Sequence, residues 1–132
     1  MTNDNCIFLV DDDSSARKGL ARLLRAAGYD VRDFASAKDF LEALISDTSG
    51  CIGLDARRTG ISNEELMVEL KARNIHLPII VVTGDDDSET RRKAQKMTVA
   101  GFFRKPVDGP ALLDAINWAL QTNLPGVNKE KV

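Results

Sequence analysis

Polar side chains of three chemical types stand directly after apolar runs of this sequence. They are carboxylates, a hydroxyl and an ammonium: Asp11, Asp12, Asp13, Asp55, Thr83 and Lys105. Clustered carboxylates repel one another, and Mg²⁺ relieves that repulsion because it binds one or two carboxylates beside a phosphate. A carboxylate can also attack phosphorus to form an aspartyl phosphate, whose oxygens an ammonium and a hydroxyl can bind. This set therefore predicts phosphoryl transfer to an aspartate.

Each member of the set also has an ordinary structural explanation, as a helix cap or a solvated loop charge. We favour that explanation for Asp13. It does not account for the whole set, because each of these polar stretches directly ends an apolar run. The set is therefore interpreted as one site whose parts come from several strand ends.

Apolar runs and amphipathic stretches alternate along the chain, which predicts five strand–helix units. The predicted strands cover residues 6–10, 29–34, 51–54, 79–82 and 100–103. The predicted helices cover residues 14–27, 36–45, 62–73, 88–96 and 108–119. Such an alternation forms a parallel sheet with right-handed crossovers and helices on both faces. The polar strand ends then meet at the carboxyl edge of the sheet, where the sites of these folds lie.

Local signals refine this prediction. Ser14 and Ser36 are expected to cap their helices, and Gly28 is expected to end the first one. Residues 29–34 alternate between apolar and polar, which favours an edge strand, whereas 79–82 form the most apolar run and favour a central strand.

The length and composition bound the class of protein. The 132 residues suffice for one domain, assigned to residues 1–122, with 123–132 as a flexible tail or the start of a linker. The net charge of −2 gives no footprint for nucleic acid, and no apolar run reaches the roughly 18 residues of a membrane span. Cys6 and Cys51 each begin a predicted strand and are expected as buried free thiols, which points to the cytoplasm.

Four segments resemble the signatures of response-regulator receiver domains, in the CheY-like superfamily. They are Leu9-Val10-Asp11-Asp12, the lone Asp55, Val82-Thr83-Gly84 and Phe102-Phe103-Arg104-Lys105-Pro106, in the family's order across about residues 6–121. Residues 31–37 and Thr83-Gly84 are most similar to the FixJ-type branch. The resemblance implies a flavodoxin-like (βα)5 fold, with a doubly wound parallel sheet in the strand order 2-1-3-4-5.

The resemblance also implies a role for each residue of the site. Asp55 would accept a phosphoryl group from the phosphohistidine of a histidine kinase or phosphotransfer protein. Mg²⁺ would be bound directly by Asp12, Asp55 and the backbone carbonyl of Arg57, and through water by Asp11. Lys105 would contact the phosphoryl group.

The same resemblance implies a switch. Thr83 would move toward the phosphoryl group and Phe102 would change rotamer, altering the face formed by helix 4, strand 5 and helix 5. The peptide bond before Pro106 would be cis. The altered face would serve an unknown output protein or domain, or a phosphorylation-dependent homodimer. Such a domain is a signalling switch that promotes only its own phosphotransfer and dephosphorylation, and does not itself bind nucleic acid.

Four residues depart from the family pattern. Arg58 and Thr59 follow the phosphoacceptor where Met and Pro are usual, Asn63 replaces a glycine, and Thr98 replaces another before the last strand. Asn63 is a mild change, because Asn tolerates a left-handed backbone. Arg58, Thr59 and Thr98 favour an alternative, a degenerate receiver that keeps the fold as a phosphorylation-independent binding module. The complete acidic, hydroxyl and ammonium set favours the working phosphoacceptor.

Two other classes fit the residues less well. A dehalogenase-type phosphatase also uses a nucleophilic Asp, but it needs a second Asp two residues later, where this chain has Arg57. The one histidine, His76, precedes Pro78 in a predicted loop and is interpreted as solvated, which argues against a phosphotransfer-histidine module.

Overall fold

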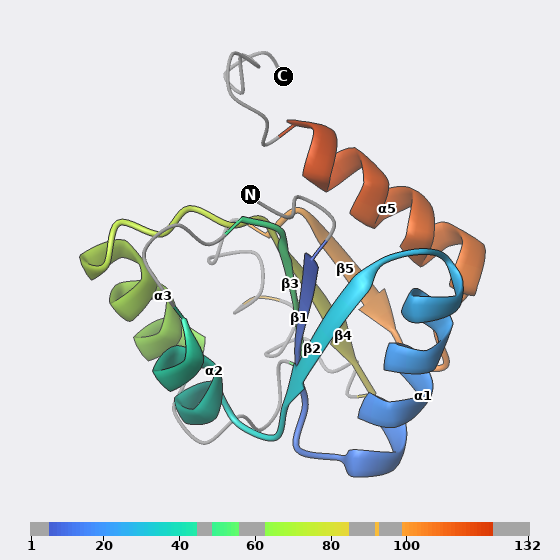
Figure 1. Ribbon diagram of the computed structural model, residues 1–132, viewed down its shortest axis with the longest axis horizontal. Helices are drawn as coiled ribbons and strands as arrows, with labels where there is room; N and C mark the ends of the chain where they lie inside the picture. The colour runs from blue at the N-terminus through green and yellow to red at the C-terminus, as the bar shows by residue number, and fades with distance from the viewer. Residues whose placement is uncertain (1–5, 45–48, 56–62, 85–91, 93–98, 123–132) are drawn as a thin grey trace.

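The computed structural model describes residues 6–44, 49–55, 63–84, 92 and 99–122. Within them, five parallel strands form one sheet in the order β2-β1-β3-β4-β5, which confirms the predicted fold and strand order. The strands are β1 Cys6–Val10, β2 Asp30–Phe34, β3 Cys51–Leu54, β4 Ile79–Thr83 and β5 Gly101–Arg104. The described helices are α1 Ser14–Ala26, α2 Ala37–Ala43, α3 Asn63–Ala72 and α5 Gly109–Thr122. Helices α1 and α5 cover one face of the sheet and α2 and α3 the other (Figure 1).

Some element boundaries differ slightly from the prediction. β2 begins at Asp30, one residue later than expected, and β5 covers residues 101–104. α2 ends at Ala43 because Leu44 is extended, with φ −73° and ψ 143°. Of the predicted helix over 88–96, only residue 92 lies within the described residues, and its conformation is helical.

The ends of α1 correct one prediction and confirm another. Ser14 was expected as the cap, but Asp13 caps the helix: its Oδ1 accepts from the backbone N–H groups of Ser15 at 3.0 Å and Ala16 at 3.2 Å. A carboxylate fits this position because it also favours the positive end of the helix dipole. Gly28 follows the helix with φ +100°, a left-handed conformation that glycine adopts without steric cost.

Ser36 caps α2 as predicted, accepting from the N–H of Asp39 at 3.1 Å. The edge position of β2 is confirmed, with Val31 buried between exposed neighbours. β4 is an interior strand between β3 and β5, and all of its residues are buried.

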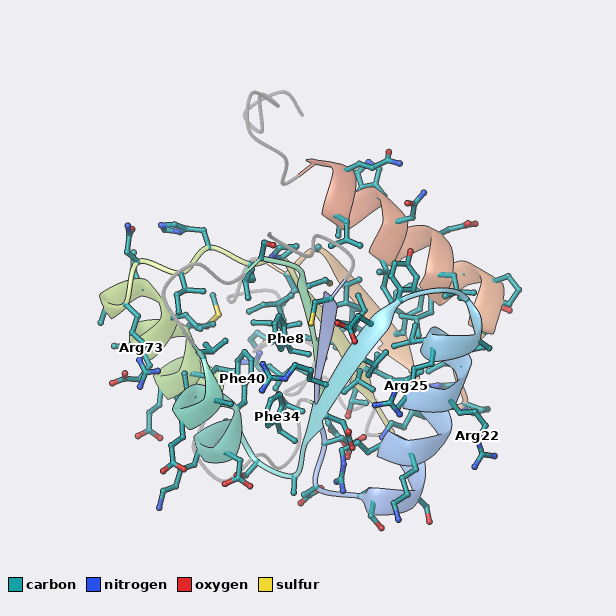
Figure 2. All side chains as sticks on the ribbon, viewed as in Figure 1. Phe8, Arg22, Arg25, Phe34, Phe40 and Arg73 are labelled. Carbon is teal, nitrogen blue, oxygen red and sulfur yellow. The ribbon has the colours of Figure 1, made fainter. Side chains whose placement is uncertain are left out.

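Two apolar cores hold the sheet, because successive strand residues point to opposite faces. Phe8, Phe34 and Phe40 gather between the sheet and α2 (Figure 2), and the ring centroid of Phe40 lies 5.7 Å from that of Phe8 and 5.5 Å from that of Phe34. The other core joins β-strand residues such as Ile7 to Leu24 of α1 and Ile116 of α5. Complete burial of such side chains contributes about 1.5–3 kcal/mol each, so both layers fix the positions of the strand ends.

Cys6 and Cys51 begin neighbouring strands but belong to opposite cores. Both are buried free thiols, as predicted. None of the described helices combines the length and apolar character needed to cross a bilayer.

Candidate functional site

The sheet ladder continues one residue past several strand ends and thereby places the site residues. The N–H of Asp11 donates to Phe34 O at 3.1 Å, and the N–H of Asp55 donates to Val10 O at 3.0 Å. The register that pairs Val10 with Leu54 therefore sets Asp11 beside Asp55. These two carboxylates come from adjacent interior strands that both cores hold in place.

Lys105 follows β5 at the same edge of the sheet, and its side chain contacts both carboxylates. Its N–H donates to Thr83 O at 2.8 Å, which extends the β4–β5 pairing. Its Nζ lies 2.9 Å from Oδ2 of Asp11 and 3.4 Å from Oδ2 of Asp55. The peptide bond between Lys105 and Pro106 is cis, the isomer that the resemblance implies.

The charge of Lys105 is stabilised by these partners. Burial lowers the pKa of the ammonium, but the hydrogen bonds and negative charges of Asp11 and Asp55 outweigh burial and raise its pKa above the usual value. Lys105 is thus cationic across the physiological range. A fixed positive charge beside a buried carboxylate suits the binding of an anionic group that arrives at that carboxylate.

Three carboxylates converge at this edge. One oxygen from each of Asp11, Asp12 and Asp55 lies within 4.8 Å of the others, with Asp11 and Asp55 buried and Asp12 exposed. This all-oxygen donor set, open on the side of Asp12, fits a hard divalent cation such as Mg²⁺. Arg57, whose carbonyl is the fourth expected ligand, lies outside the described residues.

The two expected switch residues lie on adjacent strands. Thr83 is fully buried at the end of β4 and pairs in register with Arg104 of β5. Phe102 is half-buried on β5, opposite Val81, and packs against the core that contains Phe40. Thr83 is therefore paired with the last residue of the strand that leads into Lys105.

The sequence reasoning missed Arg17. This α1 residue donates to the backbone carbonyl of Asp11 at 2.7 Å and forms an ion pair with Asp33 at 2.9 Å. The only signal in the sequence is a basic residue in the first helix and an acidic residue in the edge strand, a pattern common on solvated surfaces.

His76 lies exposed with Nε2 3.0 Å from Oδ1 of Asn74, in keeping with a solvated loop residue.

Several residues singled out from the sequence lie outside the described part of the chain. They are Arg57, Arg58, Thr59 and Thr98.

A family model described as the response regulator receiver domain matches residues 7–117. The chain belongs to this family. TdiR, a transcriptional regulatory protein of Thauera aromatica, is 41% identical over 128 residues, which are 97% of this chain and 56% of TdiR. The transcriptional regulatory protein FixJ of Azorhizobium caulinodans is 40% identical over 114 residues, covering 86% of this chain and 54% of FixJ. The receiver thus spans about half the length of these relatives.

Solved structures agree with the receiver assignment. The structure described as FixJ-N has a TM-score of 0.82 at 30% identity and covers 93% of this chain and 98% of its own. The response regulator StyR has a TM-score of 0.80 at 42% identity, covering 89% of this chain and 60% of its own. The fold and family expected from the sequence are therefore confirmed: this chain is a response regulator receiver domain of the kind found in two-component systems, and the relatives named above are transcriptional or response regulators.

Proposed function

We propose that this receiver accepts a phosphoryl group on Asp55 from the phosphohistidine of a histidine kinase or a phosphotransfer protein. The observation that supports this most strongly is the position of Lys105, whose ammonium lies against both the buried Asp55 and Asp11. The site thus combines an anionic nucleophile with a cation that can bind the incoming phosphoryl oxygens.

The proposed step balances as a simple displacement. An oxygen of Asp55 forms the new bond to phosphorus, the bond from phosphorus to the donor imidazole nitrogen breaks, and that nitrogen takes up a proton. Phosphoryl transfer needs mainly positioning and charge neutralisation from the protein. The strand register positions Asp55, and Lys105 neutralises charge on the transferred group.

Asp11, Asp12 and Asp55 are the proposed residues of a Mg²⁺ site, with the carbonyl of Arg57 as a further proposed ligand. When bound, the ion would offset the carboxylate charges and those of the phosphoryl oxygens. Asp12, which is exposed, leaves this site accessible to solvent.

The proposed switch runs from Thr83 and Phe102 to the face of helix 4, strand 5 and helix 5. The Thr83 hydroxyl would gain a phosphoryl partner in one state only, and this differential interaction is what can shift a conformational equilibrium. The backbone bond from Lys105 to Thr83 joins the two site residues across β4 and β5. The altered face would bind an output protein or domain, or a second copy of the receiver.

Residues 1–122 form the receiver and 123–132 a tail or linker. The domain would promote only its own phosphotransfer and dephosphorylation. Its proposed compartment is the cytoplasm, in keeping with two buried thiols that remain free.

The experiment that tests this function is treatment with acetyl phosphate and Mg²⁺, followed by intact-protein mass measurement. The wild-type protein should gain one phosphoryl group, and Asp55→Asn should gain none. A degenerate receiver predicts no adduct from acetyl phosphate or from any kinase. Absence of an adduct while Mg²⁺ still binds would favour that alternative.

A further inference from the structure

The polar atoms of Asp11 are bonded to four different parts of the chain. Its N–H donates to Phe34 O at 3.1 Å, and its Oδ1 accepts from the N–H of Asp13 at 2.9 Å. Its Oδ2 accepts from Lys105 at 2.9 Å. Its backbone carbonyl accepts from the guanidinium of Arg17 at 2.7 Å. The bond to Phe34 extends the sheet, the bond from Asp13 closes the loop, and the bond from Lys105 lies in the proposed site. The bond from Arg17 has no part in the proposed chemistry.

Arg17 is itself held by a second bond. Its Nε donates to Oδ2 of Asp33 on β2 at 2.9 Å, and its side chain is only 14% exposed. A guanidinium is planar and rigid, so bonds from two of its nitrogens fix the separation and direction of their acceptors. Arg17 therefore clamps the backbone after β1 to the edge strand β2.

Asp33 is shared between two guanidinium groups. Its Oδ2 pairs with Arg17 at 2.9 Å and its Oδ1 lies 3.8 Å from Arg25, so this group of three side chains carries a net positive charge. Removal of Arg17 therefore removes a positive charge, which by itself would favour a cation at Asp11 and Asp12, so weaker cation binding after its removal reports the loop geometry and not the charge.

We infer that Arg17 is a positioning residue for the acidic loop of residues 11–13. By holding the carbonyl of Asp11, it keeps the carboxylates of Asp11 and Asp12 within reach of Asp55, where the three oxygens lie within 4.8 Å. This inference rests on the proposed function, because it assigns the loop geometry to Mg²⁺ binding and phosphorylation.

The chain supplies a matched control on the same helix. Arg25 donates to Val31 O at 2.9 Å and lies 3.8 Å from Oδ1 of Asp33, so it also ties α1 to β2. Figure 2 shows Arg25 directed toward β2, whereas Arg22 points away from the sheet. Removal of Arg25 thus weakens the attachment of α1 to β2 without removing the bond to Asp11.

The experiment compares Arg17→Met with Arg25→Met by two measurements. The first is the water-exchange rate of the Asp13 amide, measured by NMR in Mg²⁺-free buffer, since this amide is bonded to the Asp11 carboxylate. The second is Mg²⁺ affinity by calorimetry. Arg17→Met should speed the exchange of that amide and weaken Mg²⁺ binding about tenfold, a size typical for residues that orient metal ligands. Arg25→Met should leave both values close to those of the wild type.

The outcomes separate this inference from the proposed function. Unchanged exchange at Asp13 would overturn the positioning role, and so would an unchanged Mg²⁺ affinity in Arg17→Met if the wild type binds the ion. If the wild type binds no Mg²⁺ while Arg17→Met still loosens the Asp13 amide, the proposed function fails and the clamp stands. If Arg17→Met does not fold, Arg17→Lys against Arg25→Lys gives the same comparison, because one ammonium cannot reproduce the rigid two-nitrogen clamp.

Discussion

The ammonium of Lys105 lies 3.4 Å from Oδ2 of Asp55, although 50 residues separate them along the chain. The same nitrogen lies 2.9 Å from Oδ2 of Asp11. Lys105 therefore binds two of the three carboxylates of the proposed Mg²⁺ site. The ammonium and a bound ion would compete for these carboxylates, while both would favour an incoming phosphoryl group.

This competition predicts opposite effects of Lys105→Met on two measurements. Removing the ammonium should strengthen Mg²⁺ binding by roughly three- to tenfold, because one partly solvated charge is worth on the order of 1 kcal/mol. It should impair the response to phosphorylation at least as much as phosphoryl binding, because the ammonium meets the phosphoryl charge only when that group is present. Calorimetry and amide exchange with and without acetyl phosphate measure the two effects. Weaker Mg²⁺ binding in Lys105→Met would argue against the competition.

Mg²⁺ should stabilise the folded protein through Asp12. At about ten times its Kd, a ligand of the native state adds about 1.4 kcal/mol, which raises the Tm of a domain of this size by roughly 5 °C. Asp12→Asn should lose most of this shift. Asp13→Asn is the matched control, because Asp13 caps α1 and Asn caps a helix equally well. Equal Tm shifts in the two variants would remove Asp12 from the site.

The hydroxyl of Thr83 should be needed for switching but not for phosphoryl acceptance. Thr83→Ala and Thr83→Ser both remove a methyl group from a fully buried position, but only Ser keeps the hydroxyl. Both should accept a phosphoryl group. On phosphorylation, exchange of amides in 101–108 should change in the wild type and Thr83→Ser, and not in Thr83→Ala. An identical response in all three proteins would exclude Thr83 as the switch.

The two cysteines predict a loss of stability at alkaline pH. Burial raises the pKa of the Cys51 thiol from 9.0 to about 12, and chiefly burial raises that of Cys6 to about 11. The unfolded thiols ionise first, so stability is complete below about pH 9 and falls as the pH rises toward 12, by roughly 1 kcal/mol at pH 10 for Cys51. The raised pKa of Lys105 acts in the same direction above 10.5.

Urea unfolding at pH 7, 9 and 10 measures this effect, and Cys51→Ala should reduce the decline. Thiol labelling at pH 8 gives a second test. Both thiols should react slowly in the folded protein and quickly in urea, since both are buried. Rapid labelling of the folded protein, or a stability that rises above pH 9, would contradict this prediction.

The carboxyl-edge part of the site could be predicted from the sequence because parallel strands end in register. Once Cys6–Val10 and Cys51–Leu54 are recognised as buried strands, Asp11 and Asp55 follow at the same edge. The pairing of β1 with β3 brings Asp11 and Asp55 together. The contact of Lys105 with Asp11 depends in addition on the long lysine side chain, because β3 and β4 lie between β1 and β5.

The contacts of Arg17 and the true cap of α1 could not be predicted in this way. Arg17 acts through a backbone carbonyl, and any residue at position 11 offers one, so the sequence carries no mark of its acceptor. Ser14 and Asp13 are both good capping residues, and only the turn conformation decides between them. Asp13 is extended, with φ −86° and ψ 107°, and so precedes the first helical residue.

Phosphorylation of Asp55 can be tested by locating the phosphoryl group after treatment with acetyl phosphate and Mg²⁺. Borohydride reduces an aspartyl phosphate to homoserine, and tandem mass spectrometry of the digested protein then identifies the converted position. We expect conversion at Asp55 in the wild type, loss of the adduct from the unreduced protein on hydroxylamine treatment, and no conversion in Asp55→Asn. A stable adduct at a serine or threonine, or conversion at another aspartate in the wild type, would rule out Asp55 as the phosphoacceptor.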